Sequence, residues 1–363
     1  MKFWRWERLL IFAFLCAGEA FGEPLQLGNA QRYSPGYTMQ FYNSRICSTF
    51  RRGKDLSLAE FLREPGPPRI MNEETPSFGL CNGTIWGKLQ IENHSGSMDW
   101  ILELMPVLDR VYIYRLRPGE DPSRPDSYEL LGLTGRAIPM KDRPMTHRNH
   151  VIPLQIAPGQ STYLLKFVAN GPFFIPATLF SRAAHQKRDY DEQLSFGAYL
   201  GVVLAILGYN LFIFISTREW AYLFYFFHTA TFGFVLFGLH GFGAQYLWPN
   251  SPVWNVRSVL FLCFLSVFWA LWFSSSFNQV SRSHRFLWNS YVYWSPLAWI
   301  LAVAALLRDD AWMWILAEVY LFCSYLLIYG TGLWSLFRGK RQARFFVIGW
   351  SVFLVFLVLE AFM

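Results

Sequence analysis

Charged side chains are scarce in this chain, and the scarcity is uneven. They make up 16% of the 363 residues, against about 25% in ordinary soluble domains. Residues 23–195 carry 20 basic and 18 acidic side chains, whereas residues 196–363 carry only 9 and 5. The formal net charge of +7 is therefore not concentrated in one basic region of the kind that binds nucleic acid, and no nucleic-acid partner is expected.

The residue patterns of catalysis and metal binding are also missing. The sequence has no nucleophile–base arrangement, no Gly-rich phosphate loop and no paired catalytic carboxylates in a plausible setting. None of the five cysteines has CxxC or Cys/His metal-site spacing. The sequence thus predicts no enzyme activity, cofactor or metal. Cys47 and Cys81 fall in an exported part, where a disulfide and two separate buried thiols are both open.

Residues 1–22 are typical of a secretory signal peptide. Lys2, Arg5 and Arg8 precede the apolar run 9–17, which is shorter than the roughly 20 residues of a membrane span. Small residues at positions 20–22 suit a cleavage site, with an uncleaved anchor as the alternative. In both cases the residues that follow are expected outside the cytoplasm.

Residues 23–182 predict an all-β sandwich. Short runs of alternating apolar and polar residues are separated by Pro, Gly, Asn and Asp clusters. A short helix is expected from Ser57 to Glu64, and residues 183–195 are expected to be a polar linker. The strand-like runs are "TIWGKLQIEN", "DWILELM", "DRVYIYRLR", "YELLGL", "HVIPLQI", "STYLLKFVANG" and "FFIPATLFS".

Residues 196–363 predict a helical transmembrane domain. Six apolar segments are long enough to cross a hydrocarbon core of about 30 Å. Only Glu318 and Glu360 carry formal charge inside them. The predicted spans are about 196–216, 221–241, 258–278, 287–307, 312–337 and 345–363.

The basic residues of the loops predict the orientation of these spans. With the sandwich outside, the cytoplasmic loops carry seven basic residues and the outer loops carry only Arg257 and Arg308. Positively charged loops favour the cytoplasm, so the bias agrees with the export signal. The seven are Arg218, Arg282, Arg285, Arg338, Lys340, Arg341 and Arg344.

Several stretches resemble the bacterial seven-transmembrane receptors with diverse intracellular signalling modules. "FGAYLGVVLAILGYNLFIFISTREWAYLFYFF", "GFGAQYLWPNSPVW" and "RFFVIGW" resemble parts of the family's transmembrane domain. "TIWGKLQIEN", "DWILELMPVLDRVYIY" and "TGRAIPMKDRPMTHRNHVIPLQI" resemble its second type of extracellular domain. The resemblance implies a jelly-roll sandwich that binds a carbohydrate-like or other small ligand, in the bacterial inner membrane.

The resemblance also implies a seventh span and a cytoplasmic output module. Neither is found before Met363, which falls in the sixth predicted span. A frameshift, a truncated gene or a fragment explains this end better than a designed stop. A signalling partner on the basic cytoplasmic loops is the alternative route for output.

Six residues of the predicted sandwich are candidates for ligand binding. Exposed aromatic rings can stack on sugars, while arginine fixes hydroxyl or acidic groups. Half of the side chains of a sandwich strand point inward, so a core position is favoured over ligand binding for the two tryptophans. The candidates are Trp86, Trp100, Tyr112, Tyr114, Arg136 and Arg143.

The spans contain a second set of candidates, for packing or coupling. Gly197, Gly201 and Gly208 are expected to form a helix-packing face, and Asn210 is expected to bond a neighbouring helix. Glu318 is expected to face the bundle, with His228 as a candidate partner, or to reach water at the interface.

The sequence as a whole predicts a membrane receptor. The sandwich would bind a small ligand outside, and the bundle would carry the change inward through the lipid bilayer. A transporter or channel subunit is one alternative, although the spans have few polar residues and no visible inverted repeat. A membrane-tethered binding protein without signalling is another.

Overall fold

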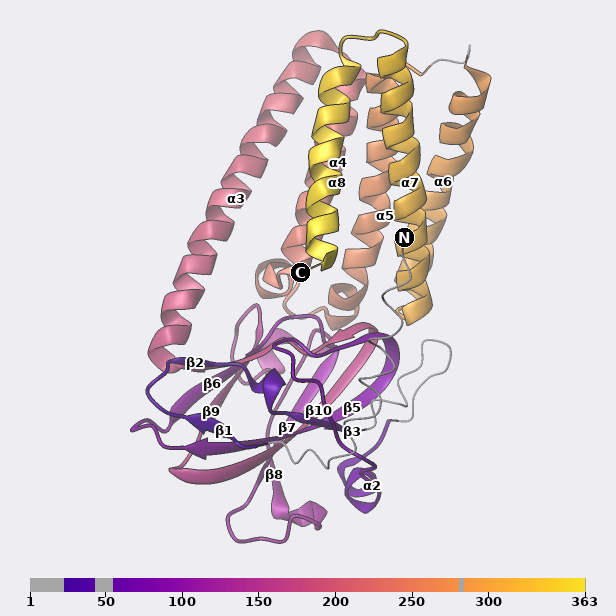
Figure 1. Ribbon diagram of the computed structural model, residues 1–363. Helices are drawn as coiled ribbons and strands as arrows, with labels where there is room; N and C mark the ends of the chain where they lie inside the picture. Colours follow the sequence, from indigo (N-terminus) through magenta and orange to yellow (C-terminus); the bar gives the residue numbers. More distant parts are fainter. Residues whose placement is uncertain (1–22, 43–54, 281–283, 363) are drawn as a thin grey trace, which may run out of the picture.

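The structure, a computed structural model, describes residues 23–42, 55–280 and 284–362. It has a β-sandwich at one end and a bundle of long helices at the other (Figure 1). The fold class predicted from the sequence is therefore confirmed. The predicted signal peptide, residues 1–22, lies outside the described ranges.

The sandwich consists of two mainly antiparallel sheets. In the larger sheet the strands follow the order β4-β3-β5-β10-β7-β8, and β1 pairs in parallel with β5. The smaller sheet has the order β2-β11-β6-β9. The larger sheet contains β1 (Leu25–Leu27), β3 (Gln40–Tyr42), β4 (Arg69–Ile70), β5 (Ser77–Asn93), β7 (Arg110–Leu116), β8 (Tyr128–Thr134) and β10 (Gly159–Phe174), and the smaller contains β2 (Arg32–Tyr33), β6 (Asp99–Leu104), β9 (His150–Gln155) and β11 (Ala177–Ser181).

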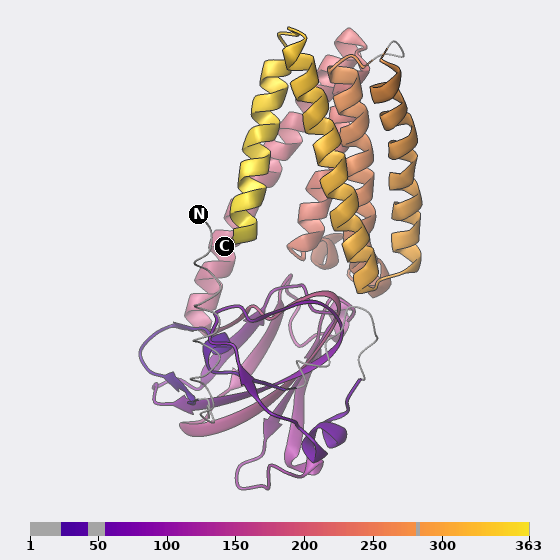
Figure 2. The ribbon, with the colours of Figure 1, turned by 45° about the vertical axis from the view of Figure 1, so that its right-hand side comes forward.

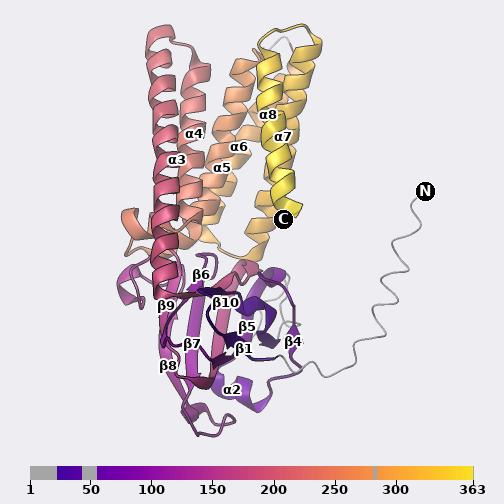
Figure 3. The same ribbon diagram turned by 60° about the vertical axis from the view of Figure 1, so that its left-hand side comes forward.

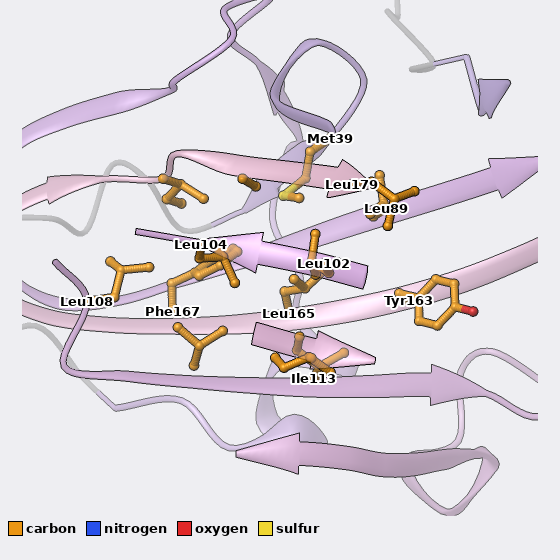
Figure 4. Close-up of a cluster of buried hydrophobic side chains, with 14 of the residues drawn as sticks. Met39, Leu89, Leu102, Leu104, Leu108, Ile113, Tyr163, Leu165, Phe167 and Leu179 are labelled. Carbon is orange, nitrogen blue, oxygen red and sulfur yellow. The ribbon is translucent and has the colours of Figure 1, made fainter. Parts of the chain in front are cut away.

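The core of the sandwich lies between the two sheets. Alternation along β7 places Val111 and Ile113 inward, where neither side chain is exposed. Leu102 of β6 and Leu179 of β11 come from the opposite sheet and approach the same layer (Figure 4). Two inner faces that interdigitate in this way account for the apolar–polar alternation seen in the sequence.

A short helix covers part of the outer face of the larger sheet. Helix α2 (Leu58–Arg63) begins in a capping box, in which the Glu60 amide donates to Ser57 Oγ at 3.3 Å. Phe61 of this helix stacks on Trp86 of β5 with ring centroids 4.7 Å apart. The helix expected at residues 57–64 is present, and it buries a tryptophan on the outside of the sheet.

Six α-helices follow the sandwich in the part of the chain that the structure describes. Five of them, α3 to α7, are long and apolar enough to cross a membrane. The sixth, α8, runs beside α7 (Figures 1 and 2), and its assignment as a span remains a prediction. The helices are α3 (Arg182–Thr217), α4 (Trp220–Leu239), α5 (Pro252–Phe277), α6 (Arg285–Leu307), α7 (Ala311–Phe337) and α8 (Ala343–Phe362).

The expected linker at residues 183–195 is not a linker. Strand β11 ends at Ser181 and helix α3 begins at the next residue, with the Ala184 amide donating to Ser181 Oγ at 3.3 Å. The segment contains neither Pro nor Gly, and Arg188 pairs with Glu192 one turn later at 2.7 Å. Its polarity reflects a helix outside the lipid rather than a flexible connection.

Hydrogen bonds between buried polar side chains join the central helices. Tyr291 of α6 shares a hydrogen bond with Ser274 of α5 at 2.9 Å and donates to Thr331 of α7 at 3.0 Å. Trp294 of α6 donates to Ser324 of α7 at 2.8 Å. Such bonds stabilise helix association where the hydrophobic effect contributes little.

The α7–α8 loop lies at the end of the bundle farthest from the sandwich (Figure 1). There the Lys340 ammonium bonds the Asn278 carbonyl, and Gln342 donates to the Phe277 carbonyl at 2.8 Å. Arg338 lies 3.2 Å from His284. The basic loop is thus held against the end of α5, on the side opposite to the sandwich.

Candidate functional site

The sandwich packs against the outer ends of helices α5 and α7. Asn255 of α5 donates to the Arg136 carbonyl at 2.9 Å. The Ala311 amide, at the start of α7, donates to Asn82 Oδ1 at 3.0 Å. In addition, strand β11 continues directly into helix α3. The sandwich is therefore attached to helices α3, α5 and α7 of the bundle.

Two glycines allow the closest approaches at this junction. A Cβ on Gly171 of β10 would lie 2.5 Å from Nε1 of Trp314 on α7. A Cβ on Gly241, which follows α4 and has φ +76°, would lie 2.3 Å from the Arg148 carbonyl oxygen. A larger residue at either position would push the two parts away from each other.

A cavity of about 220 Å³ lies between the two parts, and both of them form its wall. The sandwich contributes three arginines, Arg136, Arg143 and Arg148, together with His150. The sandwich also contributes apolar residues, namely Pro106, Val107, Pro172 and Phe174. The helices and the connection between α4 and α5 contribute the remainder, mostly apolar side chains and backbone. These residues are Gly238, Leu239, Gly241, Ala244, Asn255, Val259 and Trp314.

Two of the three arginines are paired with carboxylates. Arg136 forms an ion pair with Asp109 at 2.5 Å, and Asp109 also accepts the Asn170 amide at 2.9 Å. Arg148 forms an ion pair with Glu192 of α3, and its guanidinium lies 4.9 Å from the centre of the Phe242 ring. The charges of both arginines are therefore compensated within the protein.

Arg143 differs from the other two arginines. Its Nε donates to the Ile138 carbonyl at 3.1 Å, but its Nη1 is buried and bonds no atom of the described residues. The residue is only 8% exposed, and no described carboxylate lies within 4.0 Å of it. Burial lowers the pKa of Arg143 to about 10, so the side chain stays charged at neutral pH.

His150 completes the polar wall of the cavity. It is fully buried, and its Nδ1 shares a hydrogen bond of 3.4 Å with Thr134 Oγ1. Its Nε2 bonds no described atom. Burial, and then the nearby charge of Arg143, lower the pKa of His150 well below 6.5. The ring is therefore neutral at physiological pH.

An ionic cluster beside the cavity connects strand β6, the segment before β9 and the start of α3. Glu103 of β6 accepts from Asn149 and pairs with Arg188 of α3 at 3.3 Å. His147 pairs with Asp189 at 3.0 Å. Because each carboxylate bonds residues of another element, a displacement of α3 would change the contacts of the sandwich.

The structure brings together only part of the predicted ligand-binding set. Arg136 and Arg143 line the same cavity. Trp86 and Trp100 are buried, at 0% and 2% exposure, so neither ring offers a face to a sugar. Trp86 is covered by α2, and Trp100 packs edge-on against Tyr33 at 5.7 Å. Their burial therefore fits the core position that the sequence favours for the two tryptophans rather than a binding role.

Tyr112 and Tyr114 point to the outer face of the larger sheet. Both are half-buried, on the side of β7 opposite to Val111 and Ile113. Lys166 lies 5.3 Å from the Tyr112 ring centre. These tyrosines are not among the residues that line the cavity, and their predicted role in binding stays a prediction.

The glycine face predicted on the first span is open. A Cβ on Gly197, Gly201 or Gly208 would meet no described atom within 4 Å. Helix α3 packs on α4 and otherwise stands apart from the bundle (Figure 3). The expected packing of these glycines against a helix of this chain is therefore not found within the described residues, because α3 meets α4 through other side chains such as Val203.

Asn210 differs from expectation, because it donates to the Ile206 carbonyl of its own helix at 2.8 Å and not to a neighbouring helix. His228 bonds Ser266 of α5 at 3.0 Å. Glu318 is exposed on α7 and does not meet His228, and its contact with water at the interface stays a prediction. A helix carbonyl within reach satisfies Asn210 locally, which the sequence alone does not show.

The remaining predicted residues are the basic residues of the inner loops and the two cysteines of the exported part. Arg285, Arg338, Lys340, Arg341 and Arg344 lie at the end opposite to the sandwich, whereas Arg282 is outside the described residues. Cys81 is disulfide-bonded. Its predicted partner, Cys47, also lies outside them.

The junction residues other than Arg136 and Arg143 were not predicted from the sequence. Most of them belong to or pack against one stretch, "THRNH", residues 146–150. The sequence signal that could have identified these residues is a dense group of polar side chains directly before an apolar strand. In the structure this stretch supplies Arg148 and His150 to the cavity and His147 to the ionic cluster.

Comparison with known families assigns both parts of the chain. Residues 192–363 match the domain described as 7TM diverse intracellular signalling, and residues 53–181 match 7TMR-DISM extracellular 2. The chain belongs to the 7TMR-DISM family. Its two domains occur in the order extracellular domain, then transmembrane domain. The comparison with curated proteins gave no match.

Membership of this family shows on which side of the membrane the cavity lies. This 7TMR-DISM chain is a multi-pass membrane protein whose N-terminal domain is extracellular. The cavity between the sandwich and the helices therefore lies on the outer side of the membrane, and the α7–α8 loop lies on the inner side. The family arrangement is that of a membrane sensor with an extracellular domain.

Proposed function

We propose that this protein is a receptor that binds a small ligand from outside in the junction cavity and transmits the bound state through the helices. One observation carries the proposal: the wall of the cavity comes from both the sandwich and the bundle. A ligand there contacts both parts at once, so its affinity depends on how they are positioned. Differential affinity for two arrangements is the requirement for transmission.

Two connections would carry the change inward. Helix α3 continues from strand β11 without a flexible segment, and its first turns hold the ionic cluster with Glu103. The α4–α5 connection touches the Arg148 carbonyl at Gly241. Couplings of about 1–3 kcal/mol are usual between distant sites, and a shift of one or two such contacts supplies that amount.

On the inner side, the proposed output surface is the basic α7–α8 loop. Arg338, Lys340, Arg341 and Arg344 are close together there. An acidic surface of a signalling partner, or of an effector domain joined to the receptor, would bind this loop by charge complementarity. The ligand of the cavity and this partner are independent parts of the proposal.

Hydrogen exchange on the full chain in lipid nanodiscs tests the receptor function. A panel of small organic acids and monosaccharides is added, and exchange is followed in the sandwich and in residues 337–343. Protection of the cavity together with a change in the inner loop supports a receptor. Binding that leaves the inner loop unchanged indicates a tethered binding protein. Uptake of the bound compound into proteoliposomes indicates a transporter.

A further inference from the structure

The hydrogen-bonding groups left open in the cavity are nearly all donors. Arg143 Nη1 and Arg148 Nε are buried N–H groups that bond no described atom. His150 Nε2 is also buried and also bonds no described atom. A guanidinium has no acceptor, and imidazole can supply a donor on this nitrogen. A group that accepts several hydrogen bonds is therefore the complement of this wall.

The charges of the cavity define that group further. Asp109 compensates Arg136, and Glu192 compensates Arg148. Arg143 keeps its charge and has no carboxylate within 4.0 Å among the described residues. A buried unpaired charge is unfavourable, and one negative charge would relieve it. A ligand with a single negative charge would therefore balance the charge of Arg143.

The size and walls of the cavity favour a small organic anion. A volume of about 220 Å³ would hold roughly seven water molecules at about 30 Å³ each. Pro106, Phe174, Val259 and Trp314 give the rest of the wall an apolar character. An inorganic ion would leave this apolar part filled with water, whereas a short carbon chain would pack against it.

We propose that the junction cavity binds a small monocarboxylate, with its carboxylate on Arg143 and His150 and its carbon chain against the apolar wall contributed in part by the helices. The planar guanidinium of Arg143 matches a carboxylate in shape as well as charge. The binding step stands on the cavity alone. Its signalling consequence rests on the receptor function proposed above.

Calorimetry on the full chain in nanodiscs tests the binding step. The probes are propionate and butyrate, each compared with its neutral amide, which has nearly the same shape but no charge. We expect the acids to bind and the amides to bind at least about tenfold more weakly, because hydrogen bonds to charged groups are the strong ones. Equal binding of acid and amide, or no binding of either at millimolar concentration, would overturn the proposal.

Two variants locate the site. Arg143→Gln removes the charge and should weaken propionate binding about ten- to a hundredfold. Arg143→Lys keeps a charge and should lose less. The control is Arg124→Gln on the exposed β7–β8 connection, where the side chain is 79% exposed. If Arg143→Gln binds propionate as well as the control does, the assignment to this cavity is wrong. If Arg143→Gln fails to fold, the proposal is still tested by two measurements. One is propionate binding to Arg143→Lys, and the other is the comparison of each acid with its amide.

A phospholipid phosphate carries the same oxyanion chemistry and could come from the outer leaflet. Native mass spectrometry of the purified protein separates the two sources. A phospholipid retained by the unaltered protein and lost from Arg143→Gln would overturn the carboxylate proposal in favour of a lipid headgroup. Retained lipid that is the same in both proteins, together with propionate binding, supports the carboxylate.

The same samples distinguish this inference from the receptor function. If propionate binds through Arg143 but hydrogen exchange in residues 337–343 does not change, the carboxylate site stands and the receptor function fails. If a neutral sugar changes the inner loop while no acid binds, the receptor function stands and the carboxylate site fails.

Discussion

Glu103 in strand β6 forms a 3.3 Å ion pair with Arg188 in the first turns of helix α3. The Glu103 side chain is 6% exposed, whereas Arg188 is 33% exposed, so the pair joins the sandwich interior to the start of the first span. His185, also on α3, lies 3.4 Å from the same carboxylate. The joint between the two domains is therefore electrostatic as well as covalent.

Glu103→Gln should loosen this joint. The amide keeps the shape but removes the negative charge that Arg188 and His185 face, while Arg188 keeps its pair with Glu192. We expect a loss of about 1–3 kcal/mol in unfolding free energy. The control is Glu129→Gln, whose partner Arg115 lies 2.8 Å away at the surface and should cost under about 1 kcal/mol. Thermal unfolding in nanodiscs gives both values. Equal effects would mean that the buried cluster does not hold the domains together.

Trp86 should behave as a core residue. Trp86→Ala removes the ring that stacks on Phe61 and should cost about 3–5 kcal/mol of unfolding free energy. Trp86→Phe should cost far less, because Nε1 of Trp86 is buried without a described hydrogen-bond partner. Chemical denaturation followed by circular dichroism measures both. An alanine variant of unchanged stability would contradict the core assignment.

Arg143→Met should not destabilise the ligand-free protein. The substitution removes a buried unpaired charge at the expense of one hydrogen bond to the Ile138 carbonyl, and such a bond contributes only about 1 kcal/mol net. The melting temperature should remain the same or rise. A fall equivalent to more than about 2 kcal/mol would show that Arg143 has a structural partner, and so is not reserved for a ligand.

Carboxylate binding should strengthen as the pH falls. The pKa of His150 is lowered in the free protein, whereas a bound carboxylate would favour the imidazolium and raise it. At pH values above the lowered pKa of His150 the complex then holds more protons than the free protein, so affinity increases as the pH falls, by up to about tenfold per pH unit. The charges of Arg143, Arg136 and His147 also lower the pKa of this ring, whereas a hydrogen bond to the Leu108 backbone raises it.

Calorimetry with propionate between about pH 7.5 and pH 5.5 measures this dependence. His150→Gln should remove most of it, whereas His147→Gln, which alters the ionic cluster instead, should keep it. A pH dependence that survives in His150→Gln would assign the proton to another group.

The sequence predicted the strands and helices well because their patterns are local. Alternation at Val111 and Ile113 suffices to find strand β7, and long apolar runs suffice to find the helices. The burial of Trp86 on the outer face could not be predicted, because alternation does not reveal that a short helix covers this face of the sheet. The same limit applies to residues 183–195, where polarity indicated a linker and the structure has the first turns of helix α3.

The cavity could be predicted only in part for a related reason. Arg136 and Arg143 were found because they flank one polar loop. Their relation to Asn255 and Trp314, more than 100 residues away along the chain, depends on how a sandwich and a helix bundle meet. Neither periodicity nor composition contains this information, since the contact is made by loops and element ends.

Because strand β11 continues directly into helix α3, a small rotation at the start of the helix becomes a large displacement at its far end. A helix of 36 residues is about 54 Å long at about 1.5 Å per residue. The ionic cluster holds the first turns of this helix. A tilt of about five degrees at these turns would move the far end of the helix by about 5 Å, nearly one helical turn. A movement at the sandwich too small to disturb its core would thus arrive at the opposite membrane surface as a displacement that a neighbouring protein could detect.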